Sequence, residues 1–310
     1  MRAFFYWGTA LVFASGAAFA DWSADVEMCF ERTGSIAMDV DVCSRAIRSG
    51  ELEAENLATM YRTRGQAYNE SGAYDLAIAD FDQALKLNPY SATSLRRRGE
   101  ARHGLGQYDR ALADFDQAIE LSPNFSGAFR DRGTTYFFQG EIGRAGADYD
   151  MALGLNSFEP MAQVMRGLTR YMDGHYPAAA EDFRKAMGMA FPYPLAHLWT
   201  YLAVRRAGKD GAAELRRNAE EVDRSLWPGP LFRVYLGKLD AADALKAADK
   251  SGPKLRQRRQ VQAHYFLSML EQSRGRATVA RAHFEATLET GAKHLVEYVA
   301  ARIELERAKP

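Results

Sequence analysis

The sequence predicts an all-α fold, a solenoid built from successive pairs of antiparallel helices. Two stretches, residues 73–89 and 107–123, are nearly the same sequence written 34 residues apart. Small and aromatic residues also return at fixed places over residues 58–193. Within each copy the apolar residues are spaced by three and four, which places them on one face of a helix.

Five positions of the repeat keep their residue type in all four copies, counting residue 58 as position 1. Small residues at positions 8 and 20 let the two helices of a pair approach closely. Glycine at position 15 suits the left-handed residue that ends the first helix. We expect the ring at position 24 to fill the space between a repeat and its neighbour. The conserved types are Gly65, Gly99, Gly133 and Gly167; Gly72, Gly106, Gly140 and Gly174; Ala77, Ala111, Ala145 and Ala179; Phe81, Phe115, Tyr149 and Phe183; and Ala84, Ala118, Ala152 and Ala186.

A 34-residue period with these residues resembles the tetratricopeptide repeat (TPR). The resemblance implies a right-handed superhelix of helix pairs, in which the first helix of each pair, helix A, lines a concave groove. The second, helix B, ends at Pro89 and Pro123 in the first two repeats. One pair cannot bury its own apolar face, so neighbouring pairs must stack.

Two charged positions also recur. Position 7 is arginine and position 23 is aspartate in all four repeats, and we predict that they pair across helices A and B, within a repeat or between neighbours. The alternative is a ladder of arginines for an acidic ligand. The residues are Arg64, Arg98, Arg132 and Arg166, and Asp80, Asp114, Asp148 and Asp182.

Residues 1–20 have the pattern of a secretory signal peptide. Arg2 is their only charge, and the apolar run that follows ends in Ala-Phe-Ala before Asp21. We expect cleavage there, which predicts a periplasmic or secreted protein with no stable membrane insertion. The alternative is an uncleaved anchor, although the run is short for a membrane span.

Cys29 and Cys43 are the two cysteines of the chain. An even count in an exported protein predicts a disulfide, with two buried thiols as the alternative. We expect residues 21–57 to form a disulfide-stapled cap on the first repeat, a helix B without a normal helix A.

The repeat register weakens over residues 194–310, which we expect to form degenerate helical repeats. The polar, basic stretch 249–260 is interpreted as a solvated connection, with a binding patch as the alternative. The amphipathic stretch 293–308 suits a helix that caps the solenoid or dimerises.

This second half is similar to the cell-envelope TPR proteins of the new lipoprotein I family, over residues 226–240, 264–286 and 295–305. That resemblance implies a dimerising scaffold that recruits peptidoglycan hydrolases and a tail-specific protease. The family is lipid-anchored, whereas Asp21 stands here after the signal.

Composition and motifs indicate a protein without catalytic machinery. Lys plus Arg equals Asp plus Glu, at 40 each, which argues against a nucleic-acid partner. We find no serine-hydrolase elbow, zinc-protease motif or phosphate-binding loop. The six histidines have no metal-ligand spacing. We therefore expect no metal, no cofactor and no catalytic residues.

We expect function to lie on the faces of the A helices. The groove would be basic at one end and apolar-aromatic at the other, which suits an extended peptide or a protein tail. The known TPR clamp for a C-terminal carboxylate is not reproduced, and packing between helices is the alternative for Phe137 and Tyr171. The predicted groove residues are Arg62, Gln66, Asn69, Arg96, Arg97, Glu100, His103, Arg130, Thr134, Phe137, Phe138, Leu168, Tyr171 and Met172.

These observations predict an exported, non-catalytic adaptor that binds protein or peptide segments in its groove. Dimerisation through the second half and recruitment of envelope hydrolases or proteases rest on the resemblance. One alternative is an enzyme with a site in residues 194–260, near Trp199, Trp227 and His264. Another is a purely structural spacer.

Overall fold

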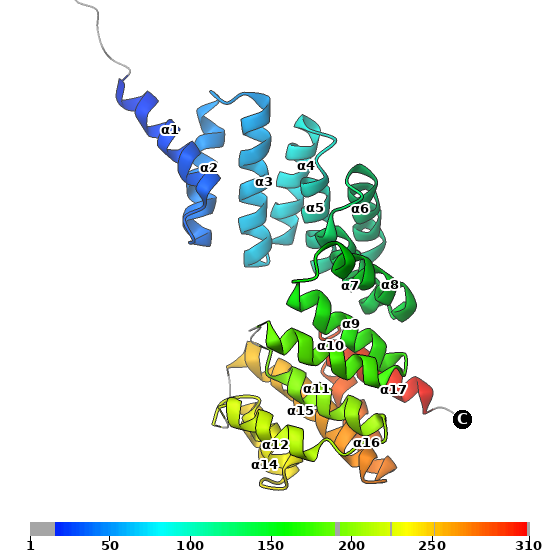
Figure 1. Ribbon diagram of the computed structural model, residues 1–310. Helices are drawn as coiled ribbons and strands as arrows, with labels where there is room; N and C mark the ends of the chain where they lie inside the picture. The colour runs from blue at the N-terminus through cyan, green and yellow to red at the C-terminus, as the bar shows by residue number, and fades with distance from the viewer. Residues whose placement is uncertain (1–15, 190–192, 224, 251, 309–310) are drawn as a thin grey trace, which may run out of the picture. The chain divides into compact units, whose positions relative to one another are not determined.

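The computed structural model contains 17 α-helices and no strand within the residues it describes (Figure 1). The all-α fold predicted from the sequence is therefore confirmed. The chain divides into two compact units, with unit 1 ending at Pro123 and unit 2 beginning at Asn124. Residues 1–15, most of the predicted signal peptide, lie outside the described part. The described ranges are 16–189, 193–223, 225–250 and 252–308.

Unit 1 consists of six helices, each packed against the next along the chain (Figure 1). Helices α3 and α4 are helices A and B of the first repeat, and α5 and α6 are those of the second. The bounds are α1 Gly16–Glu31, α2 Ile36–Ser49, α3 Ala54–Ser71, α4 Tyr74–Leu87, α5 Ala92–Gly104 and α6 Tyr108–Leu121.

The cap of unit 1 differs from the predicted one, because α1 precedes α2 and packs against it. The expected helix B therefore has a helical partner, and α1 runs across the predicted cleavage site. Cys29 on α1 and Cys43 on α2 are joined as a disulfide, and both are fully buried. They share a core with Val42 and Ala46 of α2 and with Met60 of α3, so the cap packs against the first repeat.

Helices A and B approach closely because position 8 has no side chain. A β-carbon on Gly99 would stand 2.7 Å from Phe115 Cε1, closer than such contacts allow, so the ring at position 24 rests on the glycine of its own repeat. Phe81 also belongs to a buried cluster with Ala101 of the next repeat. The ring thus packs within its repeat as well as against the neighbour that the sequence predicted.

The glycines at position 15 end the A helices as predicted. All four have a positive φ, between 73° and 89°. This left-handed conformation carries a steric cost for residues with a β-carbon. The residues are Gly72, Gly106, Gly140 and Gly174.

Unit 2 contains the third repeat (α7, α8), the fourth repeat (α9, α10) and seven further helices. No helix among the described residues is long and apolar enough to cross a membrane. The bounds are α7 Ser126–Gln139, α8 Ile142–Leu155, α9 Pro160–Met172, α10 Tyr176–Gly188, α11 Leu195–Arg206, α12 Ala212–Glu221, α13 Gly229–Tyr235, α14 Ala241–Asp249, α15 Pro253–Ser273, α16 Ala277–Glu289 and α17 Val296–Arg307.

The basic stretch 249–260 is not the solvated connection we expected. From Pro253 onward it forms the first two turns of α15, a helix of 21 residues. Proline is favoured in the first turn of a helix, and the Leu, Arg and Gln residues that follow are good helix formers. The polarity of the stretch reflects an exposed helix surface, which composition alone did not distinguish from a loop.

Trp199 lies at the centre of the core of unit 2. Its indole is fully buried, and its ring centroid lies 5.3 Å from that of Tyr171 and 5.0 Å from that of Tyr265. Phe183 stacks on it and Phe266 meets it edge-on. These rings come from α9, α10, α11 and α15, so the fourth repeat and the degenerate region share one core.

Candidate functional site

The repeated arginines at position 7 are held inside their repeats. Arg64 donates from Nε to Asp80 Oδ2 at 2.8 Å and from Nη2 to Asp80 Oδ1 at 2.7 Å. The same two-bond pairing joins Arg98 to Asp114, Arg132 to Asp148 and Arg166 to Asp182. The predicted pairing across helices A and B is confirmed, and it occurs within each repeat.

This pairing assigns the position-7 arginines a structural role. Each aspartate at position 23 is at most 5% exposed, and two-bond arginine–carboxylate pairs are strong and directional. The outer nitrogen of two of these arginines reaches one repeat further back, from Arg98 Nη1 to Asp82 and from Arg166 Nη1 to Asp150. A ligand would have to displace these carboxylates to reach the guanidinium groups.

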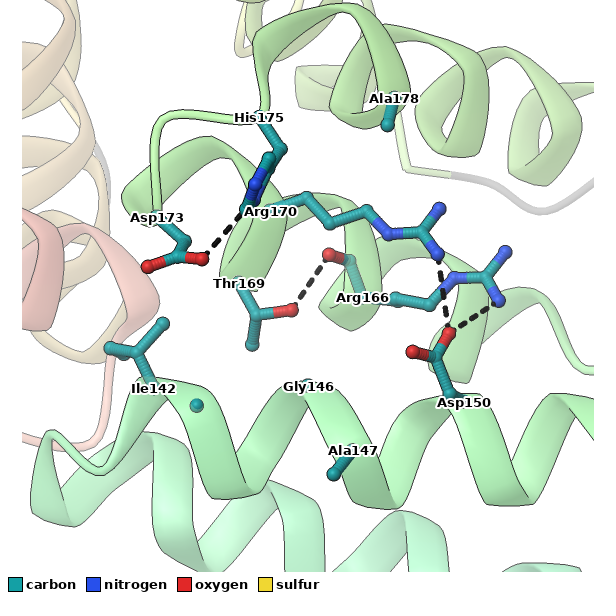
Figure 2. Close-up of a pocket in the computed structure, with 11 residues that line it drawn as sticks. Ile142, Gly146, Ala147, Asp150, Arg166, Thr169, Arg170, Asp173, His175 and Ala178 are labelled. Atoms are coloured by element: carbon teal, nitrogen blue, oxygen red, sulfur yellow. Dashed lines mark hydrogen bonds and ion pairs between the residues drawn. The ribbon is translucent and has the colours of Figure 1, made fainter.

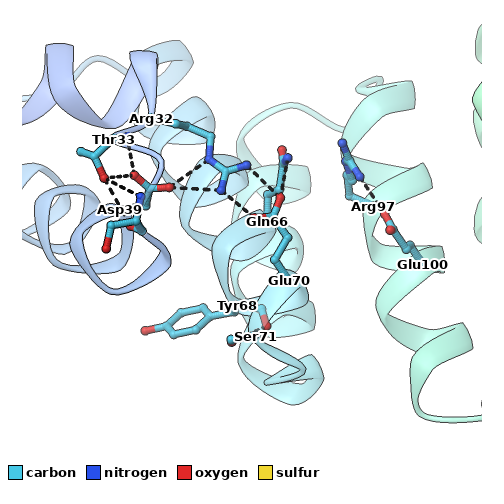
Figure 3. Close-up of polar contacts among 10 residues, drawn as sticks. Arg32, Thr33, Asp39, Gln66, Tyr68, Glu70, Ser71, Arg97 and Glu100 are labelled. Atoms are coloured by element: carbon cyan, nitrogen blue, oxygen red, sulfur yellow. Dashed lines mark hydrogen bonds and ion pairs between the residues drawn. The ribbon is translucent and has the colours of Figure 1, made fainter. Parts of the chain in front are cut away.

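The A-helix face of unit 1 carries a network of polar residues (Figure 3). Arg32 of the cap binds Glu70 on α3 through two hydrogen bonds, of 2.9 and 2.8 Å, and Gln66 donates to the same carboxylate at 3.1 Å. On α5, Arg97 donates to Glu100 at 2.9 Å. Hydrogen bonds from Arg32 and Gln66, together with the charge of Arg97, lower the pKa of the Glu70 carboxyl, so the predicted groove residues Gln66, Arg97 and Glu100 belong to one polar surface.

Arg62 differs from its neighbours on this face. It is half-buried on α3, and no hydrogen bond or ion pair to it occurs among the described residues. Burial, together with the positive charge of Arg97, lowers the pKa of its guanidinium. Arg97 is paired with Glu100, whereas Arg62 has no carboxylate partner among the described contacts, and an anionic group beside Arg62 would relieve this electrostatic cost.

A cavity of about 430 Å³ lies beside Arg62, between α3, the end of α4 and the start of α5. Its walls are mostly small or polar. The lining residues are Ala54, Glu55, Ala58, Thr59, Arg62, Ala84, Leu87, Asn88, Ser91 and Ser94. The cavity and the polar network together form the unit 1 face, the term used below for the surface of α3 and α5 that carries Arg62, Gln66, Arg97 and Glu100.

The remaining predicted residues of unit 1 contribute less to this surface. Asn69 and Arg96 are buried, at 9% and 7% exposure. The His103 ring packs against Tyr108, with centroids 5.3 Å apart. These three side chains are therefore engaged mainly in packing.

The predicted apolar-aromatic end of the groove is not open in unit 2. Phe137, Leu168, Tyr171 and Met172 are all buried, with no more than 3% of their surface exposed. The alternative for Phe137 and Tyr171, packing between helices, is the one observed. The physical reason is that large rings and aliphatic side chains gain more by burial against later helices than by facing water.

The C-terminal helix α17 lies over this end of the predicted groove. A β-carbon on Gly140, which ends α7, would stand 2.9 Å from Arg302 Nη2. Arg206 on α11 forms an ion pair of 3.0 Å with Glu304, which is 7% exposed. Leu168 lines a common cavity with Leu295 and the first residues of α17. The chain thus supplies its own helix where the sequence predicted a peptide.

The polar groove residues predicted on α7 are also engaged. Arg130 binds Asp131 and Glu159, which together raise the pKa of its guanidinium despite burial. Thr134 donates to the carbonyl of Arg130 and accepts a hydrogen bond from Tyr149 at 3.1 Å. The Phe138 ring packs edge-on against Phe137. These contacts leave the unit 1 face as the candidate functional site.

One cleft of unit 2 was missed by sequence reasoning. A space of about 530 Å³ lies between α8 and the C-terminal part of α9, with Arg166 and Arg170 on one wall, both bonded to Asp150 (Figure 2). It is open because Gly146 stands at position 21, where the first two repeats have Ile78 and Leu112. That substitution within the repeat was the available signal.

Residues 194–260 do not assemble the alternative enzyme site around the three residues proposed for it. Trp199 is in the core, and Trp227 Nε1 donates to Gln262 at 2.7 Å. His264 instead lies against His283, with their Nδ1 atoms 3.0 Å apart, and burial lowers the pKa of both rings. No group of three or more metal-binding side chains occurs among the described residues.

Comparison with known families agrees with the helix pairs. The tetratricopeptide repeat family matches residues 62–124 and 130–194. These two stretches are tetratricopeptide repeats. Two solved structures share this fold. Pseudomonas aeruginosa pilF is 14% identical over 71% of this chain and 98% of its own, with a TM-score of 0.59. A TPR protein from Parabacteroides merdae is 16% identical over 92% of this chain and 99% of its own, with a TM-score of 0.55.

No curated protein matches the sequence. TPR arrays form extended binding surfaces for other proteins, and the fold generally serves interaction rather than catalysis. The repeats therefore indicate a surface for binding other proteins, and the accessible residues must indicate what is bound.

Proposed function

We propose that this TPR protein is a non-catalytic scaffold that binds an acidic segment of another protein on the unit 1 face. The observation that carries the proposal is Arg62, a half-buried cation without a carboxylate partner beside a 430 Å³ cavity. Arg97 on α5, which is paired with Glu100, is close enough for its positive charge to act on Arg62. A carboxylate on the ligand would accept hydrogen bonds from Arg62, and charge-assisted hydrogen bonds of this kind are strong.

Site-specific photo-crosslinking in the native cell tests this proposal. A photoreactive residue replaces Gln66 on the unit 1 face or, as the matched control, Gln83, an exposed glutamine on α4. We expect a discrete captured protein from position 66 and none from position 83. The charge reversal Arg62→Glu should remove that capture, whereas Asp75→Lys on α4 should leave it unchanged. Equal capture from both glutamines, or capture that survives Arg62→Glu, contradicts the proposal.

We propose further that the protein acts outside the cytoplasm, after cleavage before Asp21. The support is the signal pattern of residues 1–20 and the position of Cys29 and Cys43, which are close enough to be joined. N-terminal sequencing of the native protein should begin at Asp21. Its mass under non-reducing conditions should be two hydrogens below that of the reduced chain. An N-terminus at Met1 in a cytoplasmic fraction would refute this part.

The resemblance of the second half to new lipoprotein I supports a finer proposal about partners. On this proposal the scaffold dimerises through its second half and recruits peptidoglycan hydrolases or a protease. Identification of the protein captured from position 66 tests this proposal directly. We expect an envelope hydrolase or protease, and capture of a protein of any other class would contradict the proposed partners.

A further inference from the structure

A small cavity in unit 2 lies where α9, α15 and the start of α17 meet. Its volume is about 190 Å³, below the range of roughly 300–1,000 Å³ used by drug-sized ligands. It can therefore take a group the size of one side chain. The apolar part of its wall consists of Met161, Val164, Met165, Leu168 and Leu295.

One carboxyl group lines this cavity without being fully bonded. Glu297 is 1% exposed, and its Oε1 has no hydrogen-bond partner among the described residues. Gln262 hydrogen-bonds the carboxyl group, and Gln262 is itself fixed by the indole N–H of Trp227 at 2.7 Å. The carboxyl group is thus held in place by a chain of two side chains while one oxygen is left unsatisfied.

An unsatisfied buried oxygen of this kind is costly to the folded protein. Burial raises the pKa of Glu297 to about 7, so near neutral pH the group divides between its neutral and charged forms. The other titratable groups on the cavity wall are Tyr193, Arg258 and His294. Arg258 is exposed at the rim, and its charge acts on Glu297, but it makes no direct ion pair with that carboxyl group among the described contacts.

We propose that this cavity binds a primary alkylammonium group, of the kind that a lysine side chain carries. The ammonium would donate a hydrogen bond to Glu297 Oε1 and neutralise the carboxylate. Its methylene stem would lie against Met161, Met165 and Leu168, as the stems of long cationic side chains commonly do on apolar surface. The site belongs to unit 2 and does not depend on the function proposed for the unit 1 face.

The proposal fixes the sign of the pH dependence. An alkylammonium with a pKa of about 10 stays charged below pH 8, so it binds the ionised form of Glu297. Affinity should therefore rise from pH 6 to pH 8 as Glu297 loses its proton. Burial keeps Tyr193 neutral over this range, because it raises the pKa of that phenol. His294 also lines the cavity, so the variant His294→Gln separates its contribution.

The experiment is a titration of the full chain with n-pentylammonium at pH 6, 7 and 8. Binding is measured from the NMR chemical shifts of the methionine methyl groups. We expect Met161 and Met165 to shift, and affinity to rise at least fivefold between pH 6 and 8 in both the native chain and His294→Gln. Glu297→Gln should weaken binding at pH 8 at least tenfold and remove the pH dependence. If Glu297→Gln does not fold, Met161→Trp, at a position that is 45% exposed, serves as a variant that fills the rim.

Two arginines give a matched pair for the same titration. Arg258→Gln removes a positive charge from the cavity wall and should strengthen alkylammonium binding severalfold. Arg259→Gln removes the adjacent charge, which lies over the Trp227 ring at 5.8 Å, and should change binding much less. Tighter binding of n-pentanoate, equal binding of n-pentanol, or no shift with any of the three probes would overturn the proposal.

Discussion

Asp114 illustrates how single residues hold a repeat together. It is 2% exposed and accepts three hydrogen bonds, two from Arg98 and a third from Arg102 Nη1 at 2.7 Å. Asp182 in the fourth repeat has the same arrangement with Arg166 and Arg170. The charge of the buried carboxylate is therefore compensated entirely by side chains of the preceding A helix.

Replacement of Asp114 tests this compensation. In Asp114→Ala the two guanidinium groups lose their common acceptor, and removing one partner of a buried pair typically costs about 3 kcal/mol or more. We expect a clear fall in the melting temperature and in the free energy of unfolding, measured by urea denaturation. Asp75→Ala, which removes an exposed aspartate in the first turn of α4, should cost less than about 1 kcal/mol. Equal effects would show that the pairing contributes nothing specific.

Replacing two helical glycines by alanine should change the stability of the protein in opposite directions. A methyl group on Gly99 would press on the Phe115 ring, whereas one on Gly154 meets no atom within 4 Å. Gly99→Ala should therefore destabilise the protein by about 1–3 kcal/mol through overpacking. Gly154→Ala should stabilise it by about 0.5 kcal/mol, because it restricts the unfolded chain. Thermal melts of the two variants check both signs, and a stable Gly99→Ala would refute the close approach of α5 and α6.

At the scale of elements, helix α17 has the largest consequence. It contributes Val299, Ala300 and Ala301 to the core of unit 2. Its Glu304 receives Arg206 from α11, and its Arg302 reaches the end of α7. An element at the end of the chain therefore decides which faces of the A helices remain accessible in unit 2.

The ion pair of α17 permits a double-mutant test. Arg206→Ala, Glu304→Ala and the double variant should show a coupling free energy of about 1 kcal/mol or more, because both side chains are largely buried. Glu306→Ala, at an exposed position on the same helix, should be nearly neutral and uncoupled from Arg206. Additive effects of Arg206→Ala and Glu304→Ala would mean that the pair does not hold α17 in place.

At the scale of the whole molecule, the two units are stabilised differently. Unit 1 is a linear stack in which each helix contacts mainly its neighbours in the chain. Unit 2 adds contacts between distant segments, such as Trp199 with Tyr265 and Phe266. Stability in a linear repeat array is roughly a sum of repeat and nearest-neighbour contributions, so it can be lost in parts.

Hydrogen exchange at rising urea concentration should separate these units. We expect the amides of α3–α6 to lose protection at lower urea than those of α11, α15 and α16, because opening the second set disrupts the Trp199 core. Mass spectrometry of peptides from each helix provides the measurement. A single concentration at which every helix loses protection would indicate one cooperative unit instead of two.

At the candidate site, the sequence predicted residues and the structure shows where they lie. It identified Arg62, Gln66, Arg97 and Glu100 as A-helix face residues, and the structure places them on one polar surface of unit 1. It did not identify the cavity at Glu297. That cavity joins Leu168 to residues near the C-terminus, and no local pattern relates them.

By itself the sequence determined the helix pairs, the left-handed glycines and the arginine–aspartate pairing. The paired arginine and aspartate lie 16 positions apart within one helix pair, where the repeat spacing fixes which side chains meet. Only the tertiary structure decided which A-helix faces stay open. Arg206 and Glu304 are 98 positions apart in the chain, so their contact depends on how every intervening helix packs. Neither the periodicity nor the composition of the sequence specifies the combined result of that packing.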